Sequence, residues 1–383
     1  MKKKLLVIIP DRLSSLLQKG EVVPRYYNPG NIFDEIHIML TNDDQPDPKL
    51  VQPMVGDAKL FIYNHPTPSG FFKKTFGWHP FLIQSWVKKA FEKIVPISPI
   101  IIRCYGMHLN LSIGSYVKEK LNLPLLVSLH THPFLDAHRE NFNLKNKIIK
   151  YFTLKLSKNL KKTDLILPVY CGILDFLEKR HIKNYQVLYN KVNACRENIK
   201  TNFDFKDNFK LICIGQQIHN KNPENLIKAV AQLKNVTLDI FGTGILNSNL
   251  KELAKSLNVN HRIKFIDSLP NAELCANLKT YDCYAACIDC IGISKTVIEA
   301  FLIKLPVLLN LNSHQQTPEL NDSICLRVPD TIDGYIKGIK QLMESKKLRE
   351  NLSENAYKYA LENFDPEKIE KQHVAIYKQY MIS

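Results

Sequence analysis

Short apolar runs alternate along the chain with stretches in which apolar residues recur at helical spacing. The runs lie at 5–9, 36–40, 60–63, 100–103, 125–129 and 165–167 in the first half, and at 211–214, 236–241, 263–266, 284–288 and 307–309 in the second. Runs of this kind are typical of buried strands, and the stretches between them are typical of amphipathic helices. Buried strands that alternate with helices predict parallel sheets, so we expect an α/β fold.

The length of the chain indicates more than one domain. With 383 residues it is long for one domain and sufficient for two, each with its own core. The polar stretch 196–208 interrupts the alternation and is the best candidate for a linker. We therefore predict a first domain at 1–195, a second domain at 209–364 and a closing helical segment at 365–383.

One stretch of the second half combines a glycine turn with the start of a helix. The chain runs from a strand end at Asp289 through Gly292 into an amphipathic helix. Gly292 permits a sharp turn, while Ser294 is placed to cap the helix and Thr296 falls in its first turn. Main-chain amides at a helix start bind anions, and Glu299, one turn further, can accept hydrogen bonds from a diol such as ribose. The stretch therefore predicts an anion site of the kind that holds a nucleotide.

This stretch resembles the donor-site signature of glycosyltransferase family 4, in which a glycine turn opens a helix ending in Glu-Ala and a Pro-Val strand follows. Glu299-Ala300 and Pro306-Val307 match that signature. Ile291, eight positions before Glu299, stands where the family has a first glutamate, so the motif is degenerate. The resemblance implies a GT-B architecture, with two Rossmann-like domains facing each other across a cleft. It implies metal-independent transfer from a nucleotide sugar with retention of anomeric configuration, and a last helix that packs back across the first domain.

A second stretch resembles the same family. Gly215 and Gln216 follow an apolar run, and their loop ends in Lys-Asn-Pro with Lys221. The family has a Gly-Arg loop ending in Lys-Asn-Pro, whose arginine and lysine grip the donor diphosphate. Gln216 takes the place of the arginine and removes a charged, bidentate phosphate contact, while Lys221 is kept. Gly242 and Gly244, after the next run, resemble the family's glycine turn near the donor.

Two histidines stand at the end of the run 125–129. The carboxyl end of a strand in an open α/β sheet is where ligands bind. The sequence Val-Ser-Leu-His that ends at His130 resembles the strand-end histidine of family 4 enzymes, which reaches the donor sugar. His130 is therefore the candidate catalytic residue, and the alternative is an imidazole that only satisfies main-chain groups. Weaker candidates are His132, His65, Asp136 and Arg139.

The loop after the first run departs from the family. Many family 4 enzymes have a glycine-rich turn there, whereas this chain has Pro-Asp-Arg-Leu-Ser at 10–14. Arg12, Lys19 and Arg25 are candidates for the anion contacts that glycine amides would otherwise make. A solvated loop is the interpretation that we favour.

Cysteine usage indicates reduced thiols in a cytosolic protein, because the nine cysteines are odd in number and mostly lie within apolar segments. Cys283, Cys287 and Cys290 have the spacing of an iron–sulfur radical enzyme, but too few residues follow for the barrel of such enzymes. Their segment is also typical of a buried strand, in which alternate thiols point to opposite faces. The resemblance implies no cofactor and no metal, and the lack of an Asp-x-Asp pair in the chain agrees with this.

The positive charge belongs to the first half of the chain. Of the formal net charge of +15, residues 1–200 carry +14, from 30 Lys and Arg against 16 Asp and Glu. This predicts an acidic partner, such as an anionic membrane surface, a phosphorylated acceptor or nucleic acid. Nucleic acid is disfavoured because no stacking or recognition motif accompanies the charge.

Two segments of the first half favour a membrane surface. Residues 71–93 interleave both tryptophans, Trp78 and Trp86, with phenylalanines and lysines, and residues 145–162 space lysines among apolar residues. The alternative is a pair of ordinary surface helices that pack on the sheet. No apolar run approaches the ~18 residues of a spanning helix. The apolar run near the N-terminus is shorter than the ~7 residues of a signal-peptide core.

We therefore expect a cytoplasmic protein, soluble or peripheral on the inner face of a membrane. It would move a sugar from a nucleotide sugar to a glycan or lipid-linked acceptor in cell-surface polysaccharide or glycolipid synthesis. The alternative is a non-catalytic member of the same fold that binds a sugar nucleotide or supports a partner transferase. The candidate residues are His130 for catalysis and, for donor binding, Gly215, Gln216, Lys221, Gly242, Gly244, Gly292, Ile293, Ser294, Lys295, Thr296 and Glu299.

Overall fold

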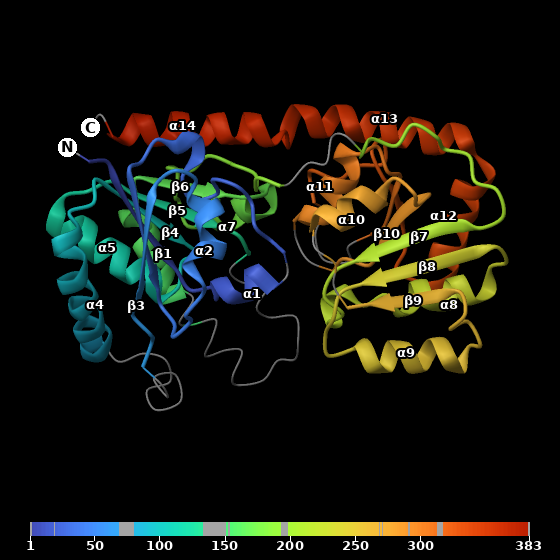
Figure 1. The fold of residues 1–383 in the computed structure, drawn as a ribbon, viewed down its shortest axis with the longest axis horizontal. Helices are drawn as coiled ribbons and strands as arrows, with labels where there is room; N and C mark the ends of the chain where they lie inside the picture. The colour runs from blue at the N-terminus through green and yellow to red at the C-terminus, as the bar shows by residue number, and fades with distance from the viewer. Residues whose placement is uncertain are drawn as a thin grey trace. The chain divides into compact units, whose positions relative to one another are not determined.

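The computed structural model divides into two compact units, Met1–Lys191 with Glu367–Ser383, and Val192–Pro366 (Figure 1). It describes residues 2–18, 20–68, 80–132, 151, 154–192, 198–267, 269, 271–289, 292–311 and 317–381. Each unit is built around one six-stranded sheet, and every strand pair in both sheets is parallel. The predicted α/β class is therefore confirmed.

The sheet of the first unit has the order β3-β2-β1-β4-β5-β6. Its strands are β1 (Lys4–Ile9), β2 (Glu35–Leu40), β3 (Lys59–Asn64), β4 (Ile101–Tyr105), β5 (Leu125–Leu129) and β6 (Leu165–Pro168). Its helices are α1 (Leu13–Gln18), α2 (Pro48–Val51), α4 (Pro80–Ile94), α5 (Leu109–Leu121), α7 (Leu174–Glu178) and α14 (Pro366–Met381), with short 3-10 turns η1 (Pro29–Asn31), η2 (Gln52–Val55), η3 (Val95–Ile97), η4 (Lys158–Lys162) and η5 (Cys171–Ile173).

Burial explains why the strands of the first unit are continuous apolar runs. Every residue of β2, β4 and β5 is buried, because helices cover both faces of a parallel sheet. The C-terminal helix α14 belongs to this covering layer. Its residues Ile369, Ile376 and Tyr377 share a core cluster with residues of β1 and β2.

The sheet of the second unit has the order β12-β11-β10-β7-β8-β9, and Figure 1 shows β7, β8 and β9 side by side. Its strands are β7 (Phe209–Ile214), β8 (Val236–Phe241), β9 (Ile263–Ile266), β10 (Cys283–Ala286), β11 (Val307–Asn310) and β12 (Leu326–Val328). Its helices are α8 (Glu224–Gln232), α9 (Asn247–Ser256), α10 (Asn271–Leu278), α11 (Lys295–Leu302), α12 (Ile332–Glu344) and α13 (Lys346–Asn363), with the 3-10 turn η7 (His219–Lys221). Each predicted run lies on one of these strands, and β12 is the strand that the pattern missed.

Much of the predicted linker is packed rather than free. The backbone N–H of Lys200 donates to the carbonyl of Ile303, and its buried ammonium donates to the carbonyls of Lys279 and Tyr281. Arg349 donates to the carbonyl of Phe203. The described part of the stretch, 198–208, therefore belongs to the second unit, because its buried polar groups find their partners there.

No helix among the described residues is long and apolar enough to cross a bilayer.

Candidate donor-binding site

The predicted turn and helix start are present at the end of β10. Gly292 has a φ of +126°, a conformation that favours glycine, and α11 begins at Lys295. Ser294 is the N-cap residue, and its hydroxyl accepts a hydrogen bond of 3.3 Å from the N–H of Val297. The cap predicted from the sequence is confirmed, and α11 presents its first turn where β10 ends.

A tyrosine that sequence reasoning missed holds this helix start in place. The hydroxyl of Tyr284, on β10, lies 2.8 Å from the Thr296 hydroxyl and donates to the Ile214 carbonyl at 3.3 Å. The Thr296 hydroxyl is in turn 3.1 Å from that of Ser294. Burial raises the pKa of Tyr284 well above its ordinary value, so the phenol keeps its proton. Its place within an apolar run made it look like an ordinary core residue.

The loop after β7 lies beside this turn. Gly215 follows the strand directly, Gln216 is exposed, and Lys221 ends the 3-10 turn η7. Burial raises the pKa of the Cys213 thiol to about 12, and the positive charge of Lys221 opposes that rise. Lys221 is therefore close enough to the Cys213 side chain, near the end of β7, for its charge to act there. The main-chain N–H of Asp289 donates to the carbonyl of Asn220 at 2.9 Å, which joins this loop to the end of β10.

The glycines Gly242 and Gly244 bring the loop after β8 against the loop after β7. A Cβ added at Gly242, whose φ is +119°, would lie 2.2 Å from the carbonyl oxygen of Gly215. One added at Gly244 would lie 2.3 Å from the carbonyl oxygen of Gln217. Close approach of two backbones is thus a sufficient reason for both glycines.

Gln217 is a second residue that the sequence did not single out. Its side chain is buried, donates to the carbonyl of Gly242 at 2.6 Å and accepts from the Asn247 amide at 2.6 Å. Its main-chain N–H and carbonyl bond to Thr243 and Leu246. A polar residue in a glycine-containing loop resembles any solvated loop residue, so no local signal distinguishes it.

A pocket lies at this junction, wholly within the second unit. Four of the predicted donor residues line it, namely Gly215, Gln216, Lys221 and Ser294, together with Cys213, Ile214, Gln217, Pro223, Ile240, Tyr284, Ala286, Cys287 and Ile288. Gly242, Gly244, Gly292, Ile293, Lys295, Thr296 and Glu299 are not among the lining residues. Glu299 is buried on α11, one turn beyond Thr296, and Ile293 and Lys295 are half-buried. The structure thus joins two of the predicted motifs around one concave site at the carboxyl ends of β7 and β10.

Several residues that the sequence singled out lie outside the described residues. They are Lys19, Trp78, Asp136, Arg139, Cys290 and Ile291. Of the suggested cysteine cluster, Cys283 donates to the Tyr284 carbonyl and Cys287 to the carboxylate of Asp330. Among the described residues no group of three or more His, Cys, Asp and Glu could hold a metal ion.

In the first unit, His130 follows β5 as predicted. Its ring stacks on that of Tyr105, with centroids 5.5 Å apart, and the Arg103 guanidinium lies 5.6 Å from the centroid of the same tyrosine ring. Two of the weaker candidates, His132 and His65, have structural partners. His132 is buried and bonds to Asp175 at 2.9 Å, and His65 is buried against the Trp86 ring and bonds to the Trp86 carbonyl.

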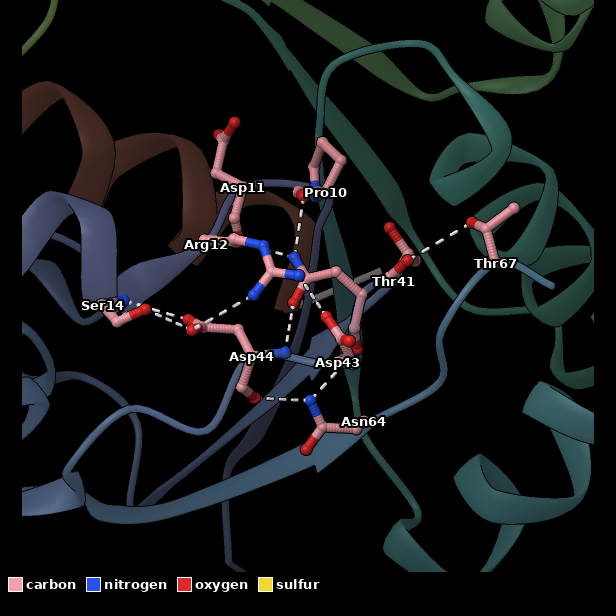
Figure 2. A network of polar contacts seen from close by, with 10 residues as sticks. Pro10, Asp11, Arg12, Ser14, Thr41, Asp43, Asp44, Asn64 and Thr67 are labelled. Carbon is pink, nitrogen blue, oxygen red and sulfur yellow. Dashed lines mark hydrogen bonds and ion pairs between the residues drawn. The ribbon is translucent and has the colours of Figure 1, made fainter. Parts of the chain in front are cut away.

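Two of the cationic residues suggested for anion contacts after β1 are paired with carboxylates. Figure 2 shows Arg12 paired with Asp43, while Asp44 accepts from both the N–H and the hydroxyl of Ser14 at the start of α1. Arg25 is likewise paired, with Glu370 of α14 at 2.7 Å. Carboxylates of the same unit thus hold both guanidinium groups, which gives Arg12 and Arg25 structural partners, and anion contacts by these residues stay a prediction.

The two segments that favour a membrane surface are partly described. Trp86 on α4 is buried and its indole N–H donates to the Pro66 carbonyl, so it is a core residue. Phe81 and Leu82 on the same helix are 76% and 48% exposed. In the second segment, Leu154 is 40% exposed.

Comparisons with known proteins fit this geometry. Residues 196–359 match the family model described as "Glycosyl transferases group 1". An uncharacterized glycosyltransferase of Methanocaldococcus jannaschii is 22% identical, over 94% of this chain and 97% of that protein. Sucrose-phosphate synthase from Thermosynechococcus elongatus has a TM-score of 0.71 at 12% identity, with 99% of each chain covered. HepE from Anabaena, solved in complex with UDP and glucose, has a TM-score of 0.71 at 16% identity, with 99% of this chain and 100% of that chain covered.

These neighbours and the two parallel six-stranded sheets confirm the expected fold of two Rossmann-like domains. Residues 196–359 of the second unit are therefore similar to a glycosyl transferases group 1 domain, and the chain has the GT-B fold.

Proposed function

We propose that the chain is a retaining, metal-independent glycosyltransferase. It transfers a sugar from a nucleotide sugar to a glycan or lipid-linked acceptor in the synthesis of cell-surface polysaccharide or glycolipid. The observation that carries the proposal is the pocket where Gly215 and Lys221 meet the capped start of α11. That pocket lies inside the region that matches the glycosyl transferases group 1 model.

The chemistry of this pocket suits a nucleoside diphosphate. Glycosyl transfer leaves a diphosphate whose negative charge grows as the sugar bond breaks. Main-chain amides at a helix N-terminus and a lysine ammonium stabilise such charge without having to reorganise. We assign this role to the α11 start and Lys221, the ribose contact to Glu299, and the contact with the transferred sugar to His130.

We further propose that the protein works at the cytoplasmic face of a membrane, as a peripheral protein. The support is the charge of +14 on residues 1–200, together with the exposed Phe81 and Leu82 near the lysines of α4. A lipid-linked acceptor would be presented at such a surface.

A non-catalytic role is the second candidate, and two positions favour it. Gln216 is exposed at the pocket and neutral where family 4 has a charged arginine, and the sequence has Ile291 in place of the first glutamate. A site with these changes would bind the nucleotide but would not transfer the sugar.

Titration of the purified protein with UDP, GDP, ADP and their sugar conjugates tests the proposal. Calorimetry should find one diphosphate that binds, and Glu299→Ala should weaken that binding. Release of free sugar or of a transfer product from the conjugate would then show that the protein is an enzyme, and its absence would favour the non-catalytic role. If no nucleotide binds at millimolar concentration, the proposed donor site is refuted.

A further inference from the structure

We propose that Tyr284 is a positioning residue that sets the spacing between the two walls of the pocket, and that diphosphate binding depends on its hydroxyl. This inference rests on the proposed function. Tyr284 reaches both walls: its hydroxyl donates to the carbonyl of Ile214, directly before Gly215, and contacts Thr296 in the first turn of α11.

The directions of these hydrogen bonds follow from counting protons. A carbonyl oxygen only accepts, so the single hydroxyl proton of Tyr284 points to Ile214. Toward Thr296, 2.8 Å away, Tyr284 must therefore accept, and the Thr296 proton points to Tyr284. Toward Ser294, 3.1 Å away, Thr296 must then accept, and the Ser294 proton points to Thr296. The three hydroxyls thus form one directed chain that ends on a main-chain carbonyl.

The directed series of three hydroxyls limits which groups can donate hydrogen bonds to a bound anion. The proton of each hydroxyl is used inside the protein, and the oxygen of Ser294 also accepts from the Val297 N–H. The hydroxyl protons therefore hold the two loops together and are not available to a diphosphate. The donors that we assign to the diphosphate are the amides of the helix start and the ammonium of Lys221. Amides act only at hydrogen-bond distance, so the fixed spacing of the walls matters for binding.

Burial makes this arrangement rigid. Tyr284 is 1% exposed, and its strand β10 lies between β7 and β11 in the sheet. The ring would stay in place in Tyr284→Phe, which removes the hydroxyl alone. Thr296→Val removes the same contact from the other side with little change of shape. Tyr281→Phe is a matched control, because the Tyr281 hydroxyl makes a 2.7 Å bond to Asp239 and Tyr281 does not line the pocket.

The experiment measures, for each variant, the dissociation constants of the diphosphate that binds the wild type best, of its monophosphate and of its nucleoside. We expect Tyr284→Phe and Thr296→Val to weaken diphosphate binding about five- to tenfold, the effect of one hydrogen bond. The nucleoside should change by less than about twofold, because it does not use the helix amides. The double variant should lose less affinity than the sum of the two single losses, because the Tyr284–Thr296 contact is removed by both substitutions.

Tyr281→Phe should lower the melting temperature without changing the ratio of diphosphate to nucleoside affinity. Unchanged diphosphate binding in Tyr284→Phe, or equal losses for diphosphate and nucleoside, would overturn the role of Tyr284 while the proposed function stands. A wild type that binds no nucleotide would overturn the proposed function and this inference together.

Discussion

At the scale of single residues, Lys221 is the charged residue that we propose binds the diphosphate. It lines the pocket beside the neutral Gln216, and it supplies the ammonium group of the site. Lys221→Ala should therefore weaken diphosphate binding by about tenfold or more, and nucleoside binding much less, because only the former loses a charged contact. Calorimetry with UDP and uridine, or the matching pair for another base, measures both.

Lys221→Arg is the control for that prediction, since it keeps the charge and should keep most of the affinity. Equal losses for diphosphate and nucleoside in Lys221→Ala would exclude a phosphate role.

His130 is a residue whose proposed task concerns the sugar and not the nucleotide. His130→Ala should lower the rate of sugar transfer or donor hydrolysis by about a hundredfold, the range for a lost catalytic hydrogen-bonding or acid–base group, and leave nucleotide affinity unchanged. Steady-state rates and calorimetric titrations on the same preparation give the comparison. A normal rate would show that the imidazole only stacks on Tyr105.

At the scale of elements, two loops pack backbone against backbone through Gly242. Gly242→Ala should destabilise the protein by about 2 to 4 kcal/mol, because its φ is positive and the new Cβ would overlap the Gly215 carbonyl. Urea unfolding measures this loss. Gly215→Ala is the comparison: its φ of +157° is also strained for alanine, but the nearest atom to the added Cβ is Lys221 Cδ at 3.8 Å, so it should cost less. Equal costs would contradict the packing explanation.

The helix α14 is held to the first unit by a carboxylate with three partners. Glu370 accepts from Arg25, from Lys191 at 2.6 Å and from the Gly30 N–H at 2.9 Å. Burial raises the pKa of Glu370, but these hydrogen bonds outweigh it and hold the pKa at about 2, below the ordinary 4.5. The pKa is lowered in the folded state, so the stabilisation is complete above the ordinary value and is lost as the pH falls toward 2.

Glu370→Gln should accordingly be less stable than the wild type at pH 7, by about 2 kcal/mol for a charged hydrogen-bonded group. The gap should narrow as the pH falls from about 5 to about 3, because protonation then favours the unfolded wild-type chain, whose carboxyl has the higher pKa. Urea unfolding at several pH values measures the gap. A gap that stays constant over this range would mean that the charge of Glu370 contributes nothing.

At the scale of the whole molecule, the charge is concentrated in residues 1–200. The full chain should sediment with vesicles that contain anionic lipid and not with neutral vesicles, and the binding should weaken as salt is raised from about 0.05 to 0.5 M. Phe81→Ser should reduce the binding, because this exposed ring is placed to enter the interface. Vesicle binding that depends neither on the charge of the lipid nor on the salt concentration would refute the proposed membrane contact.

Much of the fold followed from the sequence alone, for a local physical reason. A strand buried on both faces is mostly apolar, so β1, β2, β5 and β7 were visible as runs without knowledge of their neighbours. The cap at Ser294 was equally local, since the hydroxyl and the amide it binds are three residues apart. The short edge strand β12 escaped because Arg327 interrupts its three residues.

Tertiary structure decided what depends on residues distant in the sequence. Gln217 and Gly242, Tyr284 and Ile214, and Arg12 and Asp43 are each between 25 and 70 positions apart. A hydrogen bond needs its partner within about 3 Å, and no local pattern states which residue the fold will bring there. The sequence alone determined that the chain has two parallel α/β units and a capped helix start after a glycine turn. Only the folded structure decided that the hydroxyl of the buried Tyr284 joins that helix start to the β7 loop. This depends on which hydroxyl finds a carbonyl acceptor, and the sequence does not state it.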